Sequence, residues 1–128
     1  MNLLLKNLIA CSCFFLISQT LALEFDVNTD QIIEANKNSN EWLTHGRTYS
    51  EQRYSSLNQI NSDNIENLNI EWFYDLDSSR GHEATPLVID GIMFTTGAWS
   101  VVYANNAVTG ELLWKYDPKV PREKAYYL

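Results

Sequence analysis

Apolar and polar positions alternate most regularly over residues 83–118, which read EATPLVIDGIMFTTGAWSVVYANNAVTGELLWKYDP. A period of two is typical of β-strands, and an Asp-Gly pair between two such runs is typical of a tight hairpin turn. The pattern predicts four short antiparallel strands in a meander, over residues 86–89, 92–96, 99–104 and 111–116. The predicted turns are Asp90-Gly91, Gly97-Ala98 and Thr109-Gly110.

The last two predicted strands carry apolar side chains on both faces. In the third strand, Val101 and Tyr103 are expected on one face and Val102 on the other. In the fourth strand, Trp114 and Leu113 are expected on opposite faces. Strands that are buried on both faces need further sheets above and below them. Repeat architectures built from such units usually need about three neighbours to be stable, and this sequence contains one copy of the meander. We therefore expect the neighbours to come from residues outside this sequence.

Residues 23–69 show no steady period and are predicted to form an N-terminal arm and an ordered loop. A short helix is expected to begin near Thr29, whose hydroxyl oxygen can cap it. One further helical turn is expected at residues 62–68, because Asp63 and Glu66 stand at capping-box spacing. The apolar pattern then predicts a strand from Ile70 to Leu76.

Residues 1–22 have the features of a secretory signal peptide. Lys6 precedes an apolar run over residues 8–17, and a small-residue ending follows at Ala22. A membrane-spanning helix is the first alternative, disfavoured because the run has about ten residues and a helix needs ~20 to cross the hydrocarbon core. Lipid attachment at Cys11 is the second alternative, disfavoured because few apolar residues precede that cysteine. We therefore expect an exported protein.

Export changes how the cysteines and charges are interpreted. Cys11 and Cys13 both lie in the leader, so the mature chain would have no disulfide, zinc thiolate or thiol nucleophile. Without Lys6, eight basic residues face sixteen acidic ones, a net charge of −8. Nucleic acids and anionic membrane surfaces attract basic patches, so neither is an expected partner. A Gly-rich phosphate loop, a Ser-His-Asp set and a metal-ligand cluster are also absent from the sequence.

The third predicted turn lies within residues 104–114, ANNAVTGELLW. This segment is similar to the tryptophan-docking motif, Ala-x-Asp-x-x-Thr-Gly-x-x-x-Trp, of the propeller blades of quinoprotein dehydrogenases. Asn106 stands where the motif has Asp, and its side chain can still bond to the backbone of the turn. Gly110 allows the turn to form because a side chain at this position would hinder it. Trp114 projects from the next strand as a flat surface against which a neighbouring blade can pack.

Four segments extend the resemblance. They follow one another in the order seen near the mature N-terminus of the members of one family. They are residues 41–61, 68–76, 80–94 and 112–123. On these segments the chain is identified as a member of the alcohol dehydrogenases that use pyrroloquinoline quinone (PQQ), the methanol and ethanol dehydrogenase family. The resemblance covers nearly all of residues 41–122.

The resemblance implies an all-β fold, an eight-bladed β-propeller of which this chain supplies about the first blade. The expected division is a signal peptide over residues 1–22, an arm and loop over 23–69 and the first strands over 70–128. The family oxidises small primary alcohols in the periplasm with PQQ and calcium, and it passes electrons to a cytochrome c. We expect these cofactors, this substrate class, this partner and this location, with no stable membrane span in the mature chain.

Glu83 is the one candidate site residue that the resemblance gives. It stands just before a predicted strand and matches the family glutamate that binds the quinone. A solvated loop carboxylate is the alternative, which the residues alone would favour and the motif context disfavours. The family's adjacent cysteine pair, calcium ligands and aspartate base lie in segments that this sequence does not contain. We therefore expect no catalytic or metal-binding residue here, and no dehydrogenase activity from this segment alone.

Other conspicuous side chains are expected to be structural. His45 and His82 each lack a second ligand at metal-binding spacing. Arg47 and Arg53 are expected to hold their loop through hydrogen bonds to carbonyls, and the four tryptophans are expected to pack. Two other functions stay open at this point: a noncatalytic propeller segment used as a binding scaffold, and an independent secreted β-domain.

Overall fold

The computed structural model describes residue 25 and residues 27–123. The expected signal peptide lies outside these residues. The described part contains one short α-helix, three 3₁₀ turns and one four-stranded sheet, in the order α1, η1, η2, β1, β2, η3, β3, β4. No helix in this part of the chain is long and apolar enough to cross a membrane.

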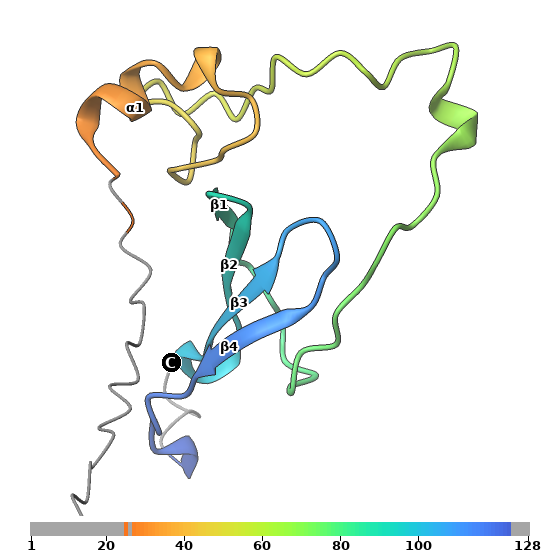
Figure 1. The fold of residues 1–128 in the computed structure, drawn as a ribbon. Coiled ribbons are helices and arrows are strands. Elements are labelled where there is room, and N and C mark those ends of the chain that lie inside the picture. The colour runs from red at the N-terminus through yellow and green to blue at the C-terminus, as the bar shows by residue number, and fades with distance from the viewer. Residues whose placement is uncertain (1–24, 26, 124–128) are drawn as a thin grey trace, which may run out of the picture.

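The sheet is an antiparallel meander with the strand order β1-β2-β3-β4, as the alternating pattern predicted (Figure 1). Its strands are β1 (Leu87–Ile89), β2 (Ile92–Thr96), β3 (Val102–Asn106) and β4 (Leu112–Tyr116). Asp90 and Gly91 join β1 to β2 with φ of 48° and 75°. A type I′ hairpin turn, whose backbone twist matches that of the two strands it joins, requires positive φ at both central residues. The predicted Asp-Gly hairpin is therefore confirmed.

The connection between β2 and β3 is longer than predicted. A strand beginning at Trp99 was expected, but residues Ala98–Ser100 form the 3₁₀ turn η3 and β3 begins at Val102. Trp99 and Ser100 have φ of 65° and 58°, which are left-handed conformations that a strand cannot contain. The amide of Gly97 donates to the Val101 carbonyl at 2.8 Å and closes this loop.

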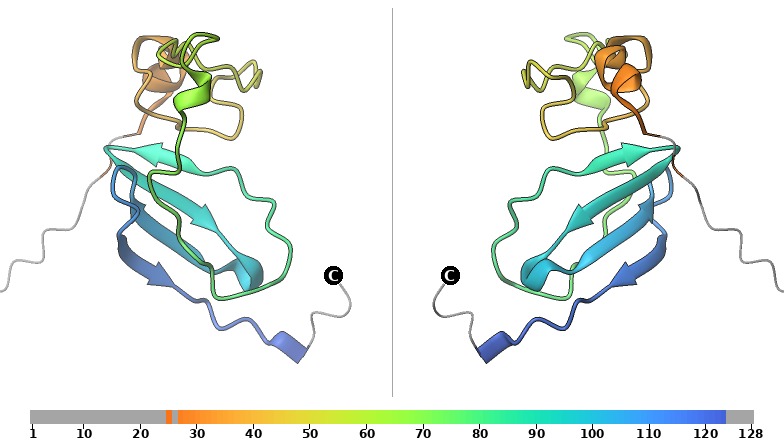
Figure 2. Two further views of the ribbon diagram at one scale, coloured as in Figure 1. Left: turned by 90° about the vertical axis from the view of Figure 1, so that its right-hand side faces the viewer. Right: turned by 90° about the vertical axis from the view of Figure 1, so that its left-hand side faces the viewer.

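The predicted strand from Ile70 to Leu76 is wrong. The segment carries no ladder hydrogen bonds, because it crosses one face of the sheet instead of pairing with an edge (Figure 2). Its burial nevertheless alternates, with Trp72, Tyr74 and Leu76 half-buried and the residues between them exposed. Tyr74 packs against Tyr103 of β3 with ring centroids 6.0 Å apart. Ile70, which has the same phase as these three residues, is 84% exposed, so the alternation in the sequence matches the burial only from Trp72 onward.

Two helix starts also differ from the predictions. Helix α1 (Thr29–Ile33) is capped by Asn28, not by Thr29, and its capping box pairs Asn28 with Gln31. The Asn28 Oδ1 accepts from the Gln31 amide at 3.1 Å, and the Gln31 Oε1 accepts from the Asn28 amide at 2.8 Å. The turn η2 (Ile65–Asn67) has Asn64 at its N-cap position and no side-chain cap, so the capping box expected from Asp63 does not form.

Arg47 holds the arm together from inside. Its side chain is 1% exposed, and it donates to the carbonyls of Ala35 and Tyr54 and to the Asn36 amide oxygen at 2.8–2.9 Å. Ala35 belongs to η1 (Ala35–Lys37), so one guanidinium joins the end of the helical region to the loop that follows it. The predicted carbonyl bonds of Arg47 are confirmed.

The arm is attached to the sheet through β1. Trp42 forms an isolated antiparallel bridge with Val88, in which each amide donates to the other residue's carbonyl, at 2.9 and 3.0 Å. This bridge adds one residue of the arm to the outer edge of the sheet's first strand. The loop that leads from the arm to Ile70 then runs away from the sheet as an arc before it returns (Figure 1).

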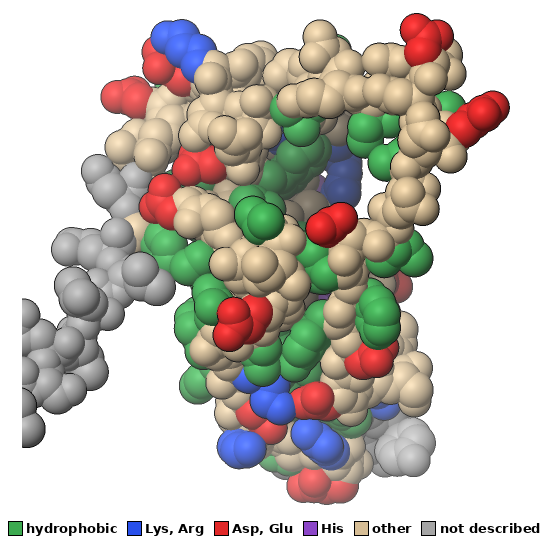
Figure 3. Space-filling model, turned by 45° about the vertical axis from the view of Figure 1, so that its right-hand side comes forward, with side chains coloured by type: hydrophobic (Ala, Val, Ile, Leu, Met, Phe, Trp, Pro, Cys, Tyr) green, Lys and Arg blue, Asp and Glu red, His purple; other side chains and the backbone are tan. Residues whose placement is uncertain are grey.

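The buried core is small and lies mainly in β2 and β3. Its buried apolar side chains in the sheet are Ile92, Tyr103 and Ala104, and Val101 lies directly before β3. Every residue of β4 is exposed, including the apolar ones on both of its faces. Many apolar side chains therefore lie open on the face shown in Figure 3. Four strands alone cannot cover the apolar groups that this sequence carries.

Candidate functional site

Glu83 lies in an irregular segment, residues 81–86, that leads into β1. The side chain is exposed, and no hydrogen bond or salt bridge within the described residues engages its carboxylate. The sheet end at which β1 begins is also the end where β2 finishes at Thr96 and β3 starts at Val102. Glu83 is therefore an open hydrogen-bond acceptor near one end of the sheet.

The segment around Glu83 is held on both sides of it. On one side, the Nε2 of His82 lies 3.3 Å from the Thr95 hydroxyl of β2. On the other side, the Thr85 hydroxyl accepts from the Arg53 guanidinium at 2.9 Å. The backbone that carries the Glu83 carboxylate is thus tied to the sheet and to the arm within two residues in each direction.

The turn between β3 and β4 has the geometry expected for the 104–114 motif. The Oδ1 of Asn106 accepts from the amides of Val108 and Thr109 at 2.9 and 3.0 Å. The buried amide of Asn105 donates to the Gly110 carbonyl at 3.0 Å. The expectation that Asn106 bonds to the backbone of the turn in place of Asp is confirmed, because the amide oxygen makes both bonds.

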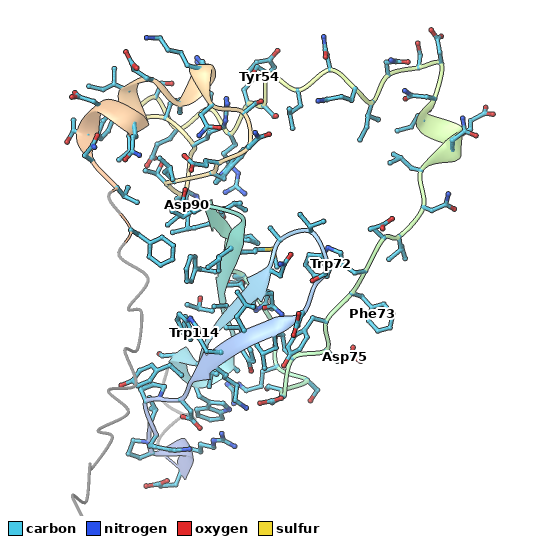
Figure 4. All side chains as sticks on the ribbon, in the orientation of Figure 1. Tyr54, Trp72, Phe73, Asp75, Asp90 and Trp114 are labelled. Carbon is cyan, nitrogen blue, oxygen red and sulfur yellow. The ribbon has the colours of Figure 1, made fainter. Side chains whose placement is uncertain are left out.

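The surface of Gly110 is covered by Trp72 and not by Trp114. A Cβ on Gly110 would lie 2.6 Å from two atoms of the Trp72 indole, whose Nε1 donates to the Ala107 carbonyl at 3.3 Å. Figure 4 shows Trp72 beside the turn between β3 and β4, with Phe73 pointing away from the sheet. Trp114 contacts Phe94 with ring centroids 5.9 Å apart and stays 42% exposed. Its free face is available to a neighbouring structural unit.

Trp99 contacts two arginines at the same end of the sheet as Glu83. The guanidinium carbons of Arg80 and Arg122 are 4.8 and 5.7 Å from the centroid of its ring. Each is within the range of a cation–π interaction, worth about 0.5–1 kcal/mol at an exposed site. Trp99 therefore joins the segment before β1 to the segment after β4, which is a structural role like the one expected for it.

Charged pairs surround this end of the sheet. The Lys115 ammonium donates to the Asp77 carboxylate, and this hydrogen bond and its charge raise the pKa of Lys115. The Lys119 backbone and side-chain N–H groups, followed by the charges of Lys119 and Arg122, lower the pKa of the Asp117 carboxyl. Lys115 is exposed and Asp117 is half-buried at the surface, so these shifts mark local ordering of surface charge.

Arg53 has different partners from those expected, and one of them is His45. No group of three or more His, Cys, Asp or Glu side chains converges within the described residues. Arg53 was expected to bind carbonyls, but it donates to the Thr85 hydroxyl and to the Nε2 of His45, at 2.9 and 3.1 Å. The hydrogen bond between Arg53 and Thr85 was not predicted, because the two residues are 32 apart in the sequence and no local pattern marks such a contact.

Comparison with known proteins identifies the fold to which these features belong. The family described as the β-propeller domain of PQQ-dependent glucose, ethanol and alcohol dehydrogenases matches residues 42–128. The dehydrogenase subunit of the quinone-dependent alcohol dehydrogenase of Komagataeibacter europaeus is 56% identical over 92 residues, which are 72% of this chain and 12% of that protein. A 1-butanol dehydrogenase (cytochrome c) of Thauera butanivorans is 56% identical over 84 residues, 66% of this chain and 12% of that protein.

The similarity extends to three dimensions. The solved structure of quinohemoprotein alcohol dehydrogenase ADHIIG of Pseudomonas putida HK5 superposes with a TM-score of 0.71 and 54% sequence identity. The matched region covers 73% of this chain and 14% of that one. The chain thus spans a small part, 12–16%, of the length of the relatives that it matches. Its four-stranded sheet is consistent with one blade of the propeller domain.

Proposed function

The chain belongs to the family of PQQ-dependent alcohol dehydrogenases, and from this we propose that it is the N-terminal part of an enzyme that oxidises primary alcohols with PQQ. The match over residues 42–128 and the similarity to alcohol dehydrogenases support the proposal. In this proposal the sheet β1–β4 is about the first blade of an eight-bladed propeller. The exposed apolar residues of β4 would pack against a neighbouring blade.

The observation that carries the proposal is the position of Glu83. A carboxylate that is exposed, unpaired within the described residues and anchored through Thr85 and His82 is suited to bind a ligand. A solvated loop carboxylate would show the same exposure, so the choice of Glu83 as a cofactor contact rests on the resemblance of residues 80–94 to the family. Glu83 therefore fits as a hydrogen-bond acceptor for a donor group of PQQ.

Within this enzyme, the proposed role of Glu83 is to bind and orient the cofactor. When bound, PQQ accepts the two electrons that the alcohol loses as it becomes an aldehyde. Glu83 would hold one edge of the cofactor, and the fixed backbone on both sides of Glu83 would limit the cofactor's movement. Orientation of this kind lowers the entropic cost of reaching the reactive geometry.

The remaining parts of the proposal concern groups outside this chain. We propose calcium as the metal ion beside the quinone, a cytochrome c as the electron acceptor and the periplasm as the location. The name of the Thauera butanivorans relative, a cytochrome c-dependent 1-butanol dehydrogenase, supports the acceptor and the substrate class. The signal-peptide features of residues 1–22 support the location.

A direct test compares Glu83→Gln with the unchanged protein, using the complete product of the gene. The purified apoprotein is titrated with PQQ in the presence of calcium, and binding is followed by quenching of tryptophan fluorescence. We expect Glu83→Gln to weaken PQQ binding about 10- to 100-fold, because a hydrogen bond to a charged group is worth ~1.5–3 kcal/mol. The matched control is Glu66→Gln, an exposed carboxylate of η2, which should leave the affinity unchanged.

Two results would contradict the proposal at different levels. Equal PQQ affinity in Glu83→Gln and in the unchanged protein would remove Glu83 from the cofactor site while leaving the enzyme assignment intact. Failure of the unchanged protein to bind PQQ, or to reduce an artificial electron acceptor with ethanol, would instead favour a noncatalytic propeller scaffold.

A further inference from the structure

Arg53 joins two parts of the chain that are distant in the sequence, the arm and the segment before β1. One of its guanidinium nitrogens, Nη1, lies 3.1 Å from the Nε2 of His45 and 2.9 Å from the Thr85 hydroxyl oxygen. Thr85 is two residues after Glu83 and two residues before β1. The guanidinium therefore connects the arm directly to the segment that carries the candidate cofactor ligand.

The chemistry of arginine fixes the direction of both bonds. A guanidinium has N–H donors and no acceptor, so the Nε2 of His45 must accept and its proton must lie on Nδ1. The Thr85 hydroxyl likewise accepts from Arg53 and keeps its own proton for another bond.

The loop that presents Arg53 adopts an unfavourable backbone conformation. Arg47, Glu51 and Arg53 have φ of 71°, 50° and 54°, and the Arg53 amide donates to the Gly46 carbonyl at 3.1 Å. A Cβ at Gly46 would lie 2.3 Å from the Glu51 Cα, so glycine is required for the loop to close. Left-handed conformations of residues other than glycine are unfavourable and persist where the surrounding structure holds them, often at functional sites.

We propose that Arg53 is a positioning residue for Glu83, holding the 83–86 segment through Thr85 so that the carboxylate meets PQQ in one orientation. The proposal rests on the function proposed above for Glu83. The opposite side of the segment is already fixed to β2 by His82 and Thr95. Arg53 supplies the second anchor, so its loss leaves the carboxylate on a segment that is fixed at one side only.

The test uses the complete gene product and two measurements, PQQ affinity and amide hydrogen exchange of residues 83–86 in the apoprotein. We expect Arg53→Gln and Thr85→Val each to weaken PQQ binding about tenfold, the effect of losing ~1.4 kcal/mol. Thr85→Ser keeps the hydroxyl and should bind PQQ like the unchanged protein, and Arg53→Lys should restore part of the affinity. Exchange at residues 83–86 should become faster in Arg53→Gln, because local opening is easier when one anchor is lost.

The double variant Arg53→Gln/Glu83→Gln shows whether Arg53 acts through Glu83. If it does, Arg53→Gln should weaken PQQ binding much less when Glu83 is already glutamine, since residues that act as one unit are not additive. An equal loss in both backgrounds would overturn the proposal and make Arg53 an independent contributor to stability. Unchanged PQQ affinity and unchanged exchange in Arg53→Gln would also overturn it.

The same experiment separates failure of this inference from failure of the proposed cofactor contact. If Glu83→Gln binds PQQ as well as the unchanged protein, the Glu83 contact is wrong, whatever the Arg53 variants do. If Glu83→Gln weakens PQQ binding while Arg53→Gln and Thr85→Val leave both measurements unchanged, the contact stands and the positioning role of Arg53 is wrong.

Discussion

The indole of Trp72 covers Gly110 so closely that a single added carbon on the glycine would collide with it. The Cβ would lie 2.6 Å from two indole atoms, although Trp72 precedes β1 and Gly110 lies in the turn between β3 and β4. Gly110 also has φ of +75°, which favours glycine independently of the contact. This one position therefore joins the segment that crosses the sheet to the turn between β3 and β4.

Gly110→Ala should destabilise the protein through both effects. The left-handed conformation costs about 1–2 kcal/mol for a residue with a Cβ, and displacement of the indole adds about 1–3 kcal/mol. Gly91→Ala is the matched control, because Gly91 has the same φ of +75° and open space around its Cβ position. Denaturant unfolding of the complete gene product should show a larger loss for Gly110→Ala. Equal losses would mean that Trp72 moves aside without cost.

Asn106 provides a test of the one position at which the turn departs from its family motif. Asn106→Ala removes the oxygen that accepts from the amides of Val108 and Thr109, and it should cost about 1–3 kcal/mol. Asn106→Asp keeps an acceptor for both amides and should unfold within about 0.5 kcal/mol of the unchanged protein. A loss in Asn106→Asp as large as in Asn106→Ala would show that the turn requires the amide NH₂ group.

The hairpins could be predicted because their signals are local. Asp90 and Gly91 are adjacent, and their residue types alone indicate a turn with two positive φ values. The strand expected at residues 70–76 illustrates the limit, since a period of two indicates which side chains share a face but not whether an edge strand is free to pair. The left-handed Trp99 gave no signal either, because φ > 0 is uncommon for such a residue.

The candidate site was predictable only in part for the same reason. Glu83 was found through the family resemblance of its neighbours, which is a local pattern. Its anchors were not found, because Arg53 contacts Thr85 across 32 residues and His82 contacts Thr95 across 13. Hydrogen bonds between distant segments follow from the packing of the chain, and a single sequence carries no periodic signal for them.

Arg47 is expected to be the most sensitive residue of the arm. Arg47→Met keeps much of the side-chain volume but leaves the carbonyls of Ala35 and Tyr54 without their donor, which should cost about 2–4 kcal/mol. Lys37→Gln is the control, because Lys37 makes an exposed pair with Glu34 and such pairs are worth about 0–1 kcal/mol. Limited proteolysis of the arm should accelerate in Arg47→Met alone. Unchanged cleavage would show that other contacts hold the arm.

Asp117 should make a pH-dependent contribution to stability. Its pKa is lowered in the folded protein by hydrogen bonds from the Lys119 backbone and side chain, so its stabilising effect is present above the ordinary carboxyl pKa. The effect is lost as the pH falls through the lower, folded value. The difference in melting temperature between Asp117→Asn and the unchanged protein should therefore shrink from about pH 6 to about pH 2. A constant difference over this range would mean that the charge of Asp117 contributes nothing.

Residues 23–128, prepared alone, should lack a cooperative fold. Ile70 and Phe73 are 84% and 78% exposed, and β4 is exposed along its whole length, so much apolar surface has no partner within the described residues. A small sheet of this kind buries too little apolar surface to offset the entropy lost on folding. Near-ultraviolet circular dichroism should show weak tryptophan signals, and heating should produce no sharp transition. Strong fixed signals and a cooperative transition, unaffected by PQQ and calcium, would instead support an independent β-domain whose function differs from the one proposed.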